Sequence, residues 1–164
     1  MRVLGIDPGT VSLGYGVVDN GEELRLVVCG ALSFHRRAPL EERLSSIYRG
    51  LSQIVARYRP DEVAVEEPFV GRNVRSALAV GRAEAIAILA AANKQLPVSY
   101  YSPAQVKKEV TSYGGSDKQQ VGEVVRMVLG LPEVPQPSDA ADALAVALCH
   151  IQQSCLKRWL EIKD

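Results

Sequence analysis

The sequence predicts an α/β fold in which a mixed five-stranded sheet is flanked by helices on both faces. Two observations carry this prediction. The Asn20-Gly21 pair lies between two apolar runs and is the strongest short-range signal for a hairpin. Beyond residue 40, helical and strand patterns alternate, which is typical of parallel strands joined through helices.

Composition agrees with this fold class. The chain has 164 residues, of which 47% are apolar and 23% are charged, as in an ordinary globular protein. A chain of this length matches one domain, so we expect a single domain over residues 1–164. We expect the residues after about 155 to be frayed, as chain ends usually are.

The first three strands are expected to form an antiparallel meander. They are predicted at Arg2–Asp7, Leu13–Asp19 and Leu24–Phe34. Apolar residues then recur at helical spacing from Leu40 to Tyr58, and this helix must end before Pro60.

The remaining elements alternate. A fourth strand at 62–67 is reached through a helix, so it should run parallel to the first. The segments that follow are a helix at 74–95, a strand at 98–101, a short helix from Pro103, a loop at 112–115, a helix at 116–129 and a long last helix with Ser138 as its N-cap.

Charge and cysteine content limit the classes of protein. The formal net charge is zero, although residues 71–126 hold eight basic and four acidic side chains and are therefore +4. Three irregularly spaced cysteines give no disulfide framework, and Cys149, His150 and Cys155 match no common zinc site. The sequence shows no signal peptide and no apolar run of membrane length, so we expect a soluble cytoplasmic protein.

Four carboxylates are the candidate catalytic residues. Asp7 and Glu66 end strands whose carboxyl ends should meet at one edge of the sheet. Asp139 and Asp142 are spaced i, i+3 and share one face of the last helix. Each has an ordinary alternative as a turn residue or as a charge that favours the helix dipole. Together they would repel unless cations neutralised them, and a site with oxygen ligands alone suits Mg²⁺ or Mn²⁺.

Four blocks of sequence resemble a known family. G-I-D-P-G-T at 5–10, G-Y-G-V at 14–17, V-E-E-P-F at 65–69 and S-D-A-A-D-A-L-A at 138–145 resemble RuvC-type Holliday-junction resolvases, the crossover junction endodeoxyribonucleases. The resemblance runs from Arg2 to about His150.

This resemblance implies a ribonuclease-H-like fold and a homodimer that cuts four-way DNA junctions by paired symmetric nicks in recombination and repair. It implies Mg²⁺, with Mn²⁺ as a substitute and two ions per site, held by Asp7, Glu66, Asp139 and Asp142. Hydrolysis would leave a 5′-phosphate and a 3′-hydroxyl. A branch-migration helicase complex (RuvA and RuvB) is the implied partner.

The family usually has Gln where this chain has Glu67. Successive strand residues face opposite ways, so only one of Glu66 and Glu67 can join the cluster, and the alignment favours Glu66. The role of Glu67 stays open, as does the choice between Asp139 and Asp142 as a direct metal ligand.

The basic segment is the candidate DNA surface. The resemblance assigns phosphate contact to Lys107 and Lys118, and a helix start near residue 74 also favours phosphate. Phe69 would either stack on bases at the junction centre or fill the core. The complete set of expected DNA contacts is Phe69, Arg72, Asn73, Arg75, Lys107, Lys108 and Lys118.

The helix from Val74 is the family's dimer face, and its small residues fit close packing against either a second copy or a neighbouring helix of the same chain. Three other functions are alternatives. An actin-like or Hsp70-like fragment shares the first motif but needs a longer chain. A ribonuclease-H-like nuclease of ribosomal RNA precursors also shares the first motif, but the Asp-Ala-Ala-Asp helix and the loop between Lys107 and Lys118 fit the resolvase better. A non-cutting binding module would have no reason to keep four carboxylates.

Overall fold

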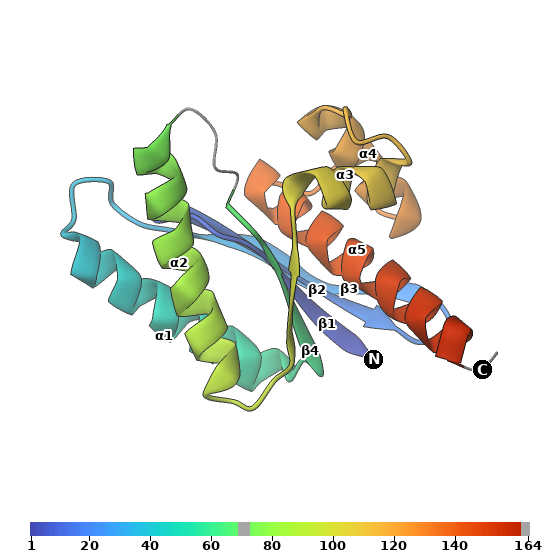
Figure 1. Cartoon of the computed structure of the whole chain (residues 1–164), viewed down its shortest axis with the longest axis horizontal. Coiled ribbons are helices and arrows are strands. Elements are labelled where there is room, and N and C mark those ends of the chain that lie inside the picture. The colour runs from blue at the N-terminus through green and yellow to red at the C-terminus, as the bar shows by residue number, and fades with distance from the viewer. Residues whose placement is uncertain (69–72, 162–164) are drawn as a thin grey trace.

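The computed structural model describes residues 1–68 and 73–161. One sheet has the strand order β3-β2-β1-β4-β5 (Figure 1). The strands are β1 (Arg2–Asp7), β2 (Ser12–Asn20), β3 (Leu24–Ser33), β4 (Glu62–Glu66) and β5 (Val98–Tyr101). The first three strands pair antiparallel, whereas β4 is parallel to both β1 and β5, so the predicted mixed sheet is confirmed. The carboxyl ends of β1 and β4 therefore lie side by side.

Helices cover both faces of the sheet (Figure 1). They are α1 (Leu40–Tyr58), α2 (Val74–Ala92), α3 (Pro103–Thr111), α4 (Lys118–Val128) and α5 (Ser138–Glu161). The first two share an apolar core with one face, and the other three share a second core with the opposite face. Among the described residues, no helix combines the length and the apolar character that crossing a membrane requires.

Strand alternation assigns each residue of β1 to one of these cores. Leu4 and Ile6 belong to the core under α1 and α2. Val3 belongs to the core under α5, and a side chain at Gly5 would meet α5 itself. Because neighbouring residues of a strand face opposite ways, Asp7 faces α5. The same rule in β4 places Val65 against α1 and α2, and Glu66 on the side of α5.

Several helix boundaries differ from the prediction. The second helix ends at Ala92 because the chain turns there and Gln95 adopts a left-handed backbone conformation with φ 57°. Helix α4 begins at Lys118 because the Asp117 side chain accepts the backbone N–H of Gln120, and Gln120 bonds back to Asp117. Ser138 is already the first residue of α5. The expected fraying after about residue 155 stays a prediction.

Candidate active site

Three carboxylates from two separate elements meet at the edge of the sheet. Asp7 ends β1, while Asp139 and Asp142 occupy the first turns of α5. One oxygen from each of these three side chains lies within 4.8 Å of the others. All three side chains are half-buried. The predicted meeting of β1 with the start of the last helix is therefore present, at a spacing that a single metal ion could span.

Glycines allow α5 to approach this closely. Gly14 of β2 is paired with Asp7 of β1 and lies under the start of α5. A Cβ at Gly14 would collide with the backbone carbonyl of Asp139, and one at Gly5 would collide with that of Ala143. The short distance between Asp7 and the helix carboxylates depends on the absence of these side chains.

Ser12 contacts one of these carboxylates, which the sequence did not indicate. Its hydroxyl donates a short hydrogen bond to the carboxylate of Asp139. This bond fixes one oxygen of Asp139 and leaves the other free to serve as a ligand. The only sequence signal was the position of Ser12 at the start of a strand that follows a Gly-rich turn.

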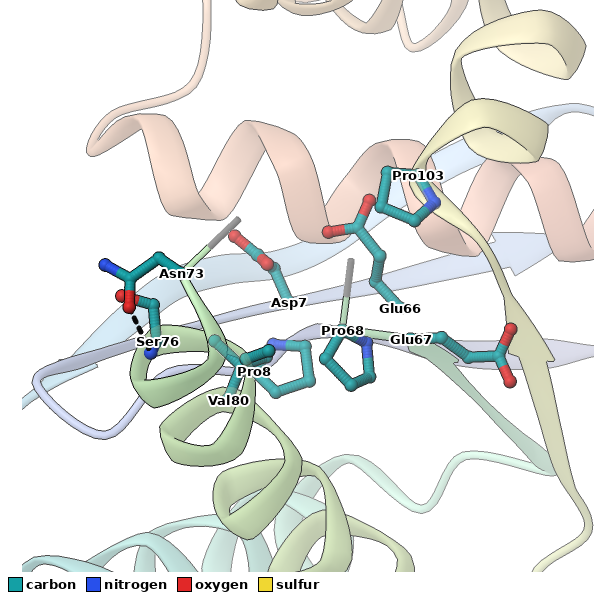
Figure 2. A pocket seen from close by; sticks show the side chains of 10 residues that line it. Asp7, Pro8, Glu66, Glu67, Pro68, Asn73, Ser76, Val80 and Pro103 are labelled. Atoms are coloured by element: carbon teal, nitrogen blue, oxygen red, sulfur yellow. Dashed lines mark hydrogen bonds between the residues drawn. The ribbon is translucent and has the colours of Figure 1, made fainter. Parts of the chain in front are cut away.

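Glu66 also lies beside Asp7, and its side chain is hydrogen-bonded to that of Asp7. Figure 2 shows the two side chains on the side of the sheet that faces α5, whereas the side chain of Glu67 extends away from them. Glu66 is outside the group of three carboxylates that lie within 4.8 Å of one another. Asp7 is therefore close both to Glu66 and to the two aspartates of α5.

In the absence of a cation, the protonated forms of Asp7 and Glu66 are favoured. Burial raises the pKa of Asp7 from its ordinary 3.8 to about 8, and the charges of Glu66 and Asp142 add to this effect. Burial also raises the pKa of Glu66, although the hydrogen bond with Asp7 opposes the rise. A bound divalent cation would favour the ionised form of both.

Two lysines approach the carboxylates from α3 and α4. The Nζ of Lys118 lies 2.6 Å from Oδ2 of Asp142, and this bond raises the pKa of the lysine. Lys107, Lys118, Asp7, Glu66 and Asp142 line one hollow of about 170 Å³. The side chain of Lys118 is 70% exposed, so it can contact both the carboxylates and a ligand that arrives from solvent.

A larger hollow of about 540 Å³ opens on the other side of Asp7. Glu66, Asn73 and Ser76 contribute to its wall (Figure 2). Asn73 caps α2 because its side chain accepts the backbone N–H of Ser76 at 3.1 Å. The start of α2 thus faces the carboxylates across an open cavity.

The other expected DNA contacts are distributed around these two hollows. Arg75 is exposed in the first turn of α2, and Lys108 is exposed on α3. Phe69 and Arg72 lie outside the described residues. The structure therefore brings Asn73, Lys107 and Lys118 next to the carboxylates, whereas Arg75 and Lys108 are surface residues of the neighbouring helices.

Clustered carboxylates at the carboxyl edge of a ribonuclease-H-like sheet, with lysines beside them, define a nuclease that hydrolyses phosphodiester bonds. Comparison with known proteins identifies the family. The family model of the crossover junction endodeoxyribonuclease RuvC matches residues 3–150. The chain belongs to this family.

Relatives and solved structures agree with the assignment. The crossover junction endodeoxyribonuclease RuvC of Dehalococcoides mccartyi is 53% identical over 154 residues, which are 93% of this chain and 92% of that protein. The corresponding protein of Chloroflexus aggregans is 54% identical over 151 residues, with 92% of each chain covered. The structure of Thermus thermophilus RuvC in complex with Holliday junction substrate superimposes with a TM-score of 0.89 at 39% identity and covers 96% of both chains.

Proposed function

We propose that this chain resolves four-way DNA junctions by metal-dependent hydrolysis, with one nick in each of two symmetry-related strands. The group of Asp7, Asp139 and Asp142, with Glu66 bonded to Asp7, is the observation that carries the proposal. Membership of the RuvC family supplies the substrate class. Water would add to the scissile phosphorus and the bond to the 3′ oxygen would break, which leaves a 5′-phosphate and a 3′-hydroxyl.

The donor set fits Mg²⁺, with Mn²⁺ as a substitute. All four groups are carboxylates, and hard divalent cations prefer oxygen ligands. Asp7, Glu66, Asp139 and Asp142 would together hold these ions, two per active site in this proposal. Ions held there would supply an activated water and would stabilise charge on the leaving oxygen.

Lys107 and Lys118 bind the scissile phosphate in this proposal. Both line the small hollow next to Asp7 and Asp142. Lys118 is bonded to Asp142, so it must exchange part of this contact for a phosphate oxygen when metal neutralises the aspartate. Binding through lysines and phosphates weakens steeply as salt concentration rises.

The start of α2 receives the DNA strand next to the cut. Asn73 and Ser76 border the larger hollow, and exposed Arg75 lies on the same helical turn. Backbone N–H groups at a helix N-terminus favour phosphate. The same proposal includes three further DNA contacts. Lys108 and Arg72 would bind the DNA backbone, and Phe69 would stack on unpaired bases at the junction centre.

The symmetric reaction needs two active sites, and we assign the dimer contact to α2. Ala83 and Ala87 of this helix are buried against the chain's own core. Val74, Leu78 and Leu89 are instead exposed by 67%, 55% and 47%. Apolar side chains at this spacing form a stripe along the outer face, which a second copy of the helix could cover. Partnership with a branch-migration helicase rests on the family resemblance alone.

A synthetic four-way junction tests the proposal. The protein is incubated with this junction and Mg²⁺, beside linear duplex and RNA–DNA hybrid controls, and the nicks are mapped on a denaturing gel. We expect paired, symmetry-related nicks on the junction and none after chelation by EDTA. The Asp7→Asn variant should bind the junction without cutting it. Equal cutting of linear duplex or of the hybrid would contradict the proposal.

A further inference from the structure

A buried histidine connects α5 to two strands of the sheet. His150 is 3% exposed and lies among the apolar residues of the core under α5. Its Nδ1 is 2.8 Å from the hydroxyl of Tyr101 on β5, and its Nε2 is 2.7 Å from a carboxylate oxygen of Glu62 on β4. Because a carboxylate only accepts, Nε2–H donates to Glu62, and the Tyr101 hydroxyl can donate to Nδ1.

These contacts are remote from the carboxylates of the active site. Glu62 begins β4, whereas Glu66 ends it. His150 follows Asp142 by eight residues, which is about 12 Å along a helix. The histidine therefore cannot touch the reacting atoms, and any effect on them must pass through α5.

Where α5 crosses β1, small residues let it lie close to the sheet. The backbone of Ala143 and the methyl group of Ala147, both on α5, are the groups that lie closest to Gly5. Leu144, which packs over Gly16, is the larger side chain at this contact. Small residues on both sides permit close approach, and larger side chains of α5 such as Leu148 and Ile151 pack in the surrounding core. Hydrogen bonds to fixed points on two strands resist sliding, because they lose strength within a fraction of an ångström.

We propose that His150 is a positioning residue for the metal site. Its bonds to Tyr101 and Glu62 add to the apolar core and to the Ser12–Asp139 bond in fixing the axial position of α5 on the sheet, and this position sets the spacing of Asp139 and Asp142 from Asp7. A shift by a single residue would move both aspartates by about 1.5 Å, whereas metal–ligand distances tolerate about 0.2 Å. Buried polar contacts set the register of packed helices in other proteins by the same principle.

Tyr101 extends this effect to the fourth carboxylate. Its backbone carbonyl accepts the N–H of Glu67 at 2.9 Å, directly after Glu66. The residue that bonds His150 through its side chain thus holds the end of β4 through its backbone. The inference rests on the proposed function, since it assumes that the carboxylates bind metal.

Metal affinity of the intact protein is the test, because simple loss of stability does not predict a change in it. Mn²⁺ is titrated by electron paramagnetic resonance without DNA, well below the melting temperature of each variant. We expect His150→Leu to weaken Mn²⁺ binding about tenfold or more, as removal of supporting contacts does at other metal sites. At saturating metal, kcat on the junction should fall while KM stays the same.

Two sets of variants make the result decisive. Leu148→Ala opens a cavity in the same core and lowers the melting temperature, but it leaves the three polar side chains in place. We expect it to keep wild-type Mn²⁺ affinity. Glu62→Gln retains an acceptor for Nε2–H and should also bind Mn²⁺ normally, whereas Glu62→Ala and Tyr101→Phe should each bind it more weakly. These milder variants serve in place of His150→Leu if that variant does not fold.

Wild-type Mn²⁺ affinity in His150→Leu, Glu62→Ala and Tyr101→Phe would overturn the positioning role. A loss in Leu148→Ala as large as that in His150→Leu would overturn it as well, because the effect would then be one of stability alone. Failure of the proposed function looks different, since the wild-type protein itself would then bind no Mn²⁺ or leave the junction uncut.

Discussion

At the scale of single residues, Glu66 and Glu67 show how the strand period selects a side chain. Glu66 ends β4 and Glu67 directly follows it, yet only Glu66 faces Asp7. The sequence predicted that one of the two would join the cluster, and alternation in β4 explains the choice. The contact of Ser12 with Asp139 was not predicted, because Ser12 lies outside the four motifs and only the docked α5 brings Asp139 to it.

Because the side chains of Glu66 and Glu67 point in different directions, their glutamine variants form a matched pair. We expect Glu66→Gln to lower the cleavage rate about 100-fold, since a lost metal ligand costs several kcal/mol of transition-state stabilisation. Glu67→Gln removes the same charge from the other face and should cut within a few-fold of wild type. Single-turnover cleavage of the junction at saturating protein measures both, and equal losses would contradict the assignment.

The raised pKa of Asp7 predicts how stability depends on pH. Between about pH 4 and pH 8 the folded protein holds a proton on Asp7 that the unfolded chain releases, because the pKa rises from 3.8 to about 8 on folding. Stability of the metal-free protein should therefore fall as pH rises through this window. Asn at this position stays neutral at every pH, so the Asp7→Asn variant should escape that loss.

The two proteins are compared by thermal melting in EDTA at several pH values. Their melting temperatures should be similar near pH 4, and by pH 9 Asp7→Asn should melt several degrees higher, since about 1 kcal/mol shifts the midpoint by roughly 2–4 °C in a domain of this size. Mg²⁺ at pH 8 should stabilise the wild type more than the variant. A difference between the two that did not change with pH would contradict the raised pKa.

At the scale of elements, the hairpin between β2 and β3 was predicted correctly, but its turn differs from the usual one. Residues 21–23 connect the strands, and Gly21 does not adopt a positive φ. Local sequence therefore located the turn without defining its geometry. The glycines of β1 and β2 differ from this turn, because local sequence does not show their role. Their role is to leave room for α5, and it becomes visible only in the folded structure.

Gly14→Ala tests that docking. Its methyl group would overlap the backbone of Asp139, and relief of such a clash costs about 1–3 kcal/mol and displaces α5. We expect a lower melting temperature together with strongly reduced cleavage at every Mg²⁺ concentration. Gly21→Ala is the matched control, because nothing lies within 4 Å of the added methyl group. Normal cleavage by Gly14→Ala would show that the site tolerates a displaced α5.

The outer face of α2 gives a prediction for assembly. Leu78→Glu places a charge in the proposed dimer contact without disturbing the core, since Leu78 is 55% exposed. We expect a folded monomer by light scattering, and single nicks in place of paired ones. Leu156→Glu on α5, at a leucine that is 50% exposed, should leave the dimer intact. A dimer that survived Leu78→Glu would move the contact to another surface.

At the scale of the whole molecule, the net charge of zero hides two opposed regions. The segment 71–126 is +4 and supplies Lys107 and Lys118, while the remaining residues carry the four carboxylates of the proposed metal site. Two divalent cations would add four positive charges, so the metal-loaded protein would be net positive when it meets DNA. Overall composition could not show this, because the charges are separated only in the folded chain.

The site lies where β1 meets both β4 and α5, and this affects when the protein becomes able to cut DNA. Asp7 and Glu66 are made early in synthesis, but Asp139 and Asp142 lie in the last helix. A nascent chain that ends before residue 138 has half of the carboxylates and lacks the helix that covers them. Because the site is assembled from distant parts of the sequence, it forms only when the final helix docks.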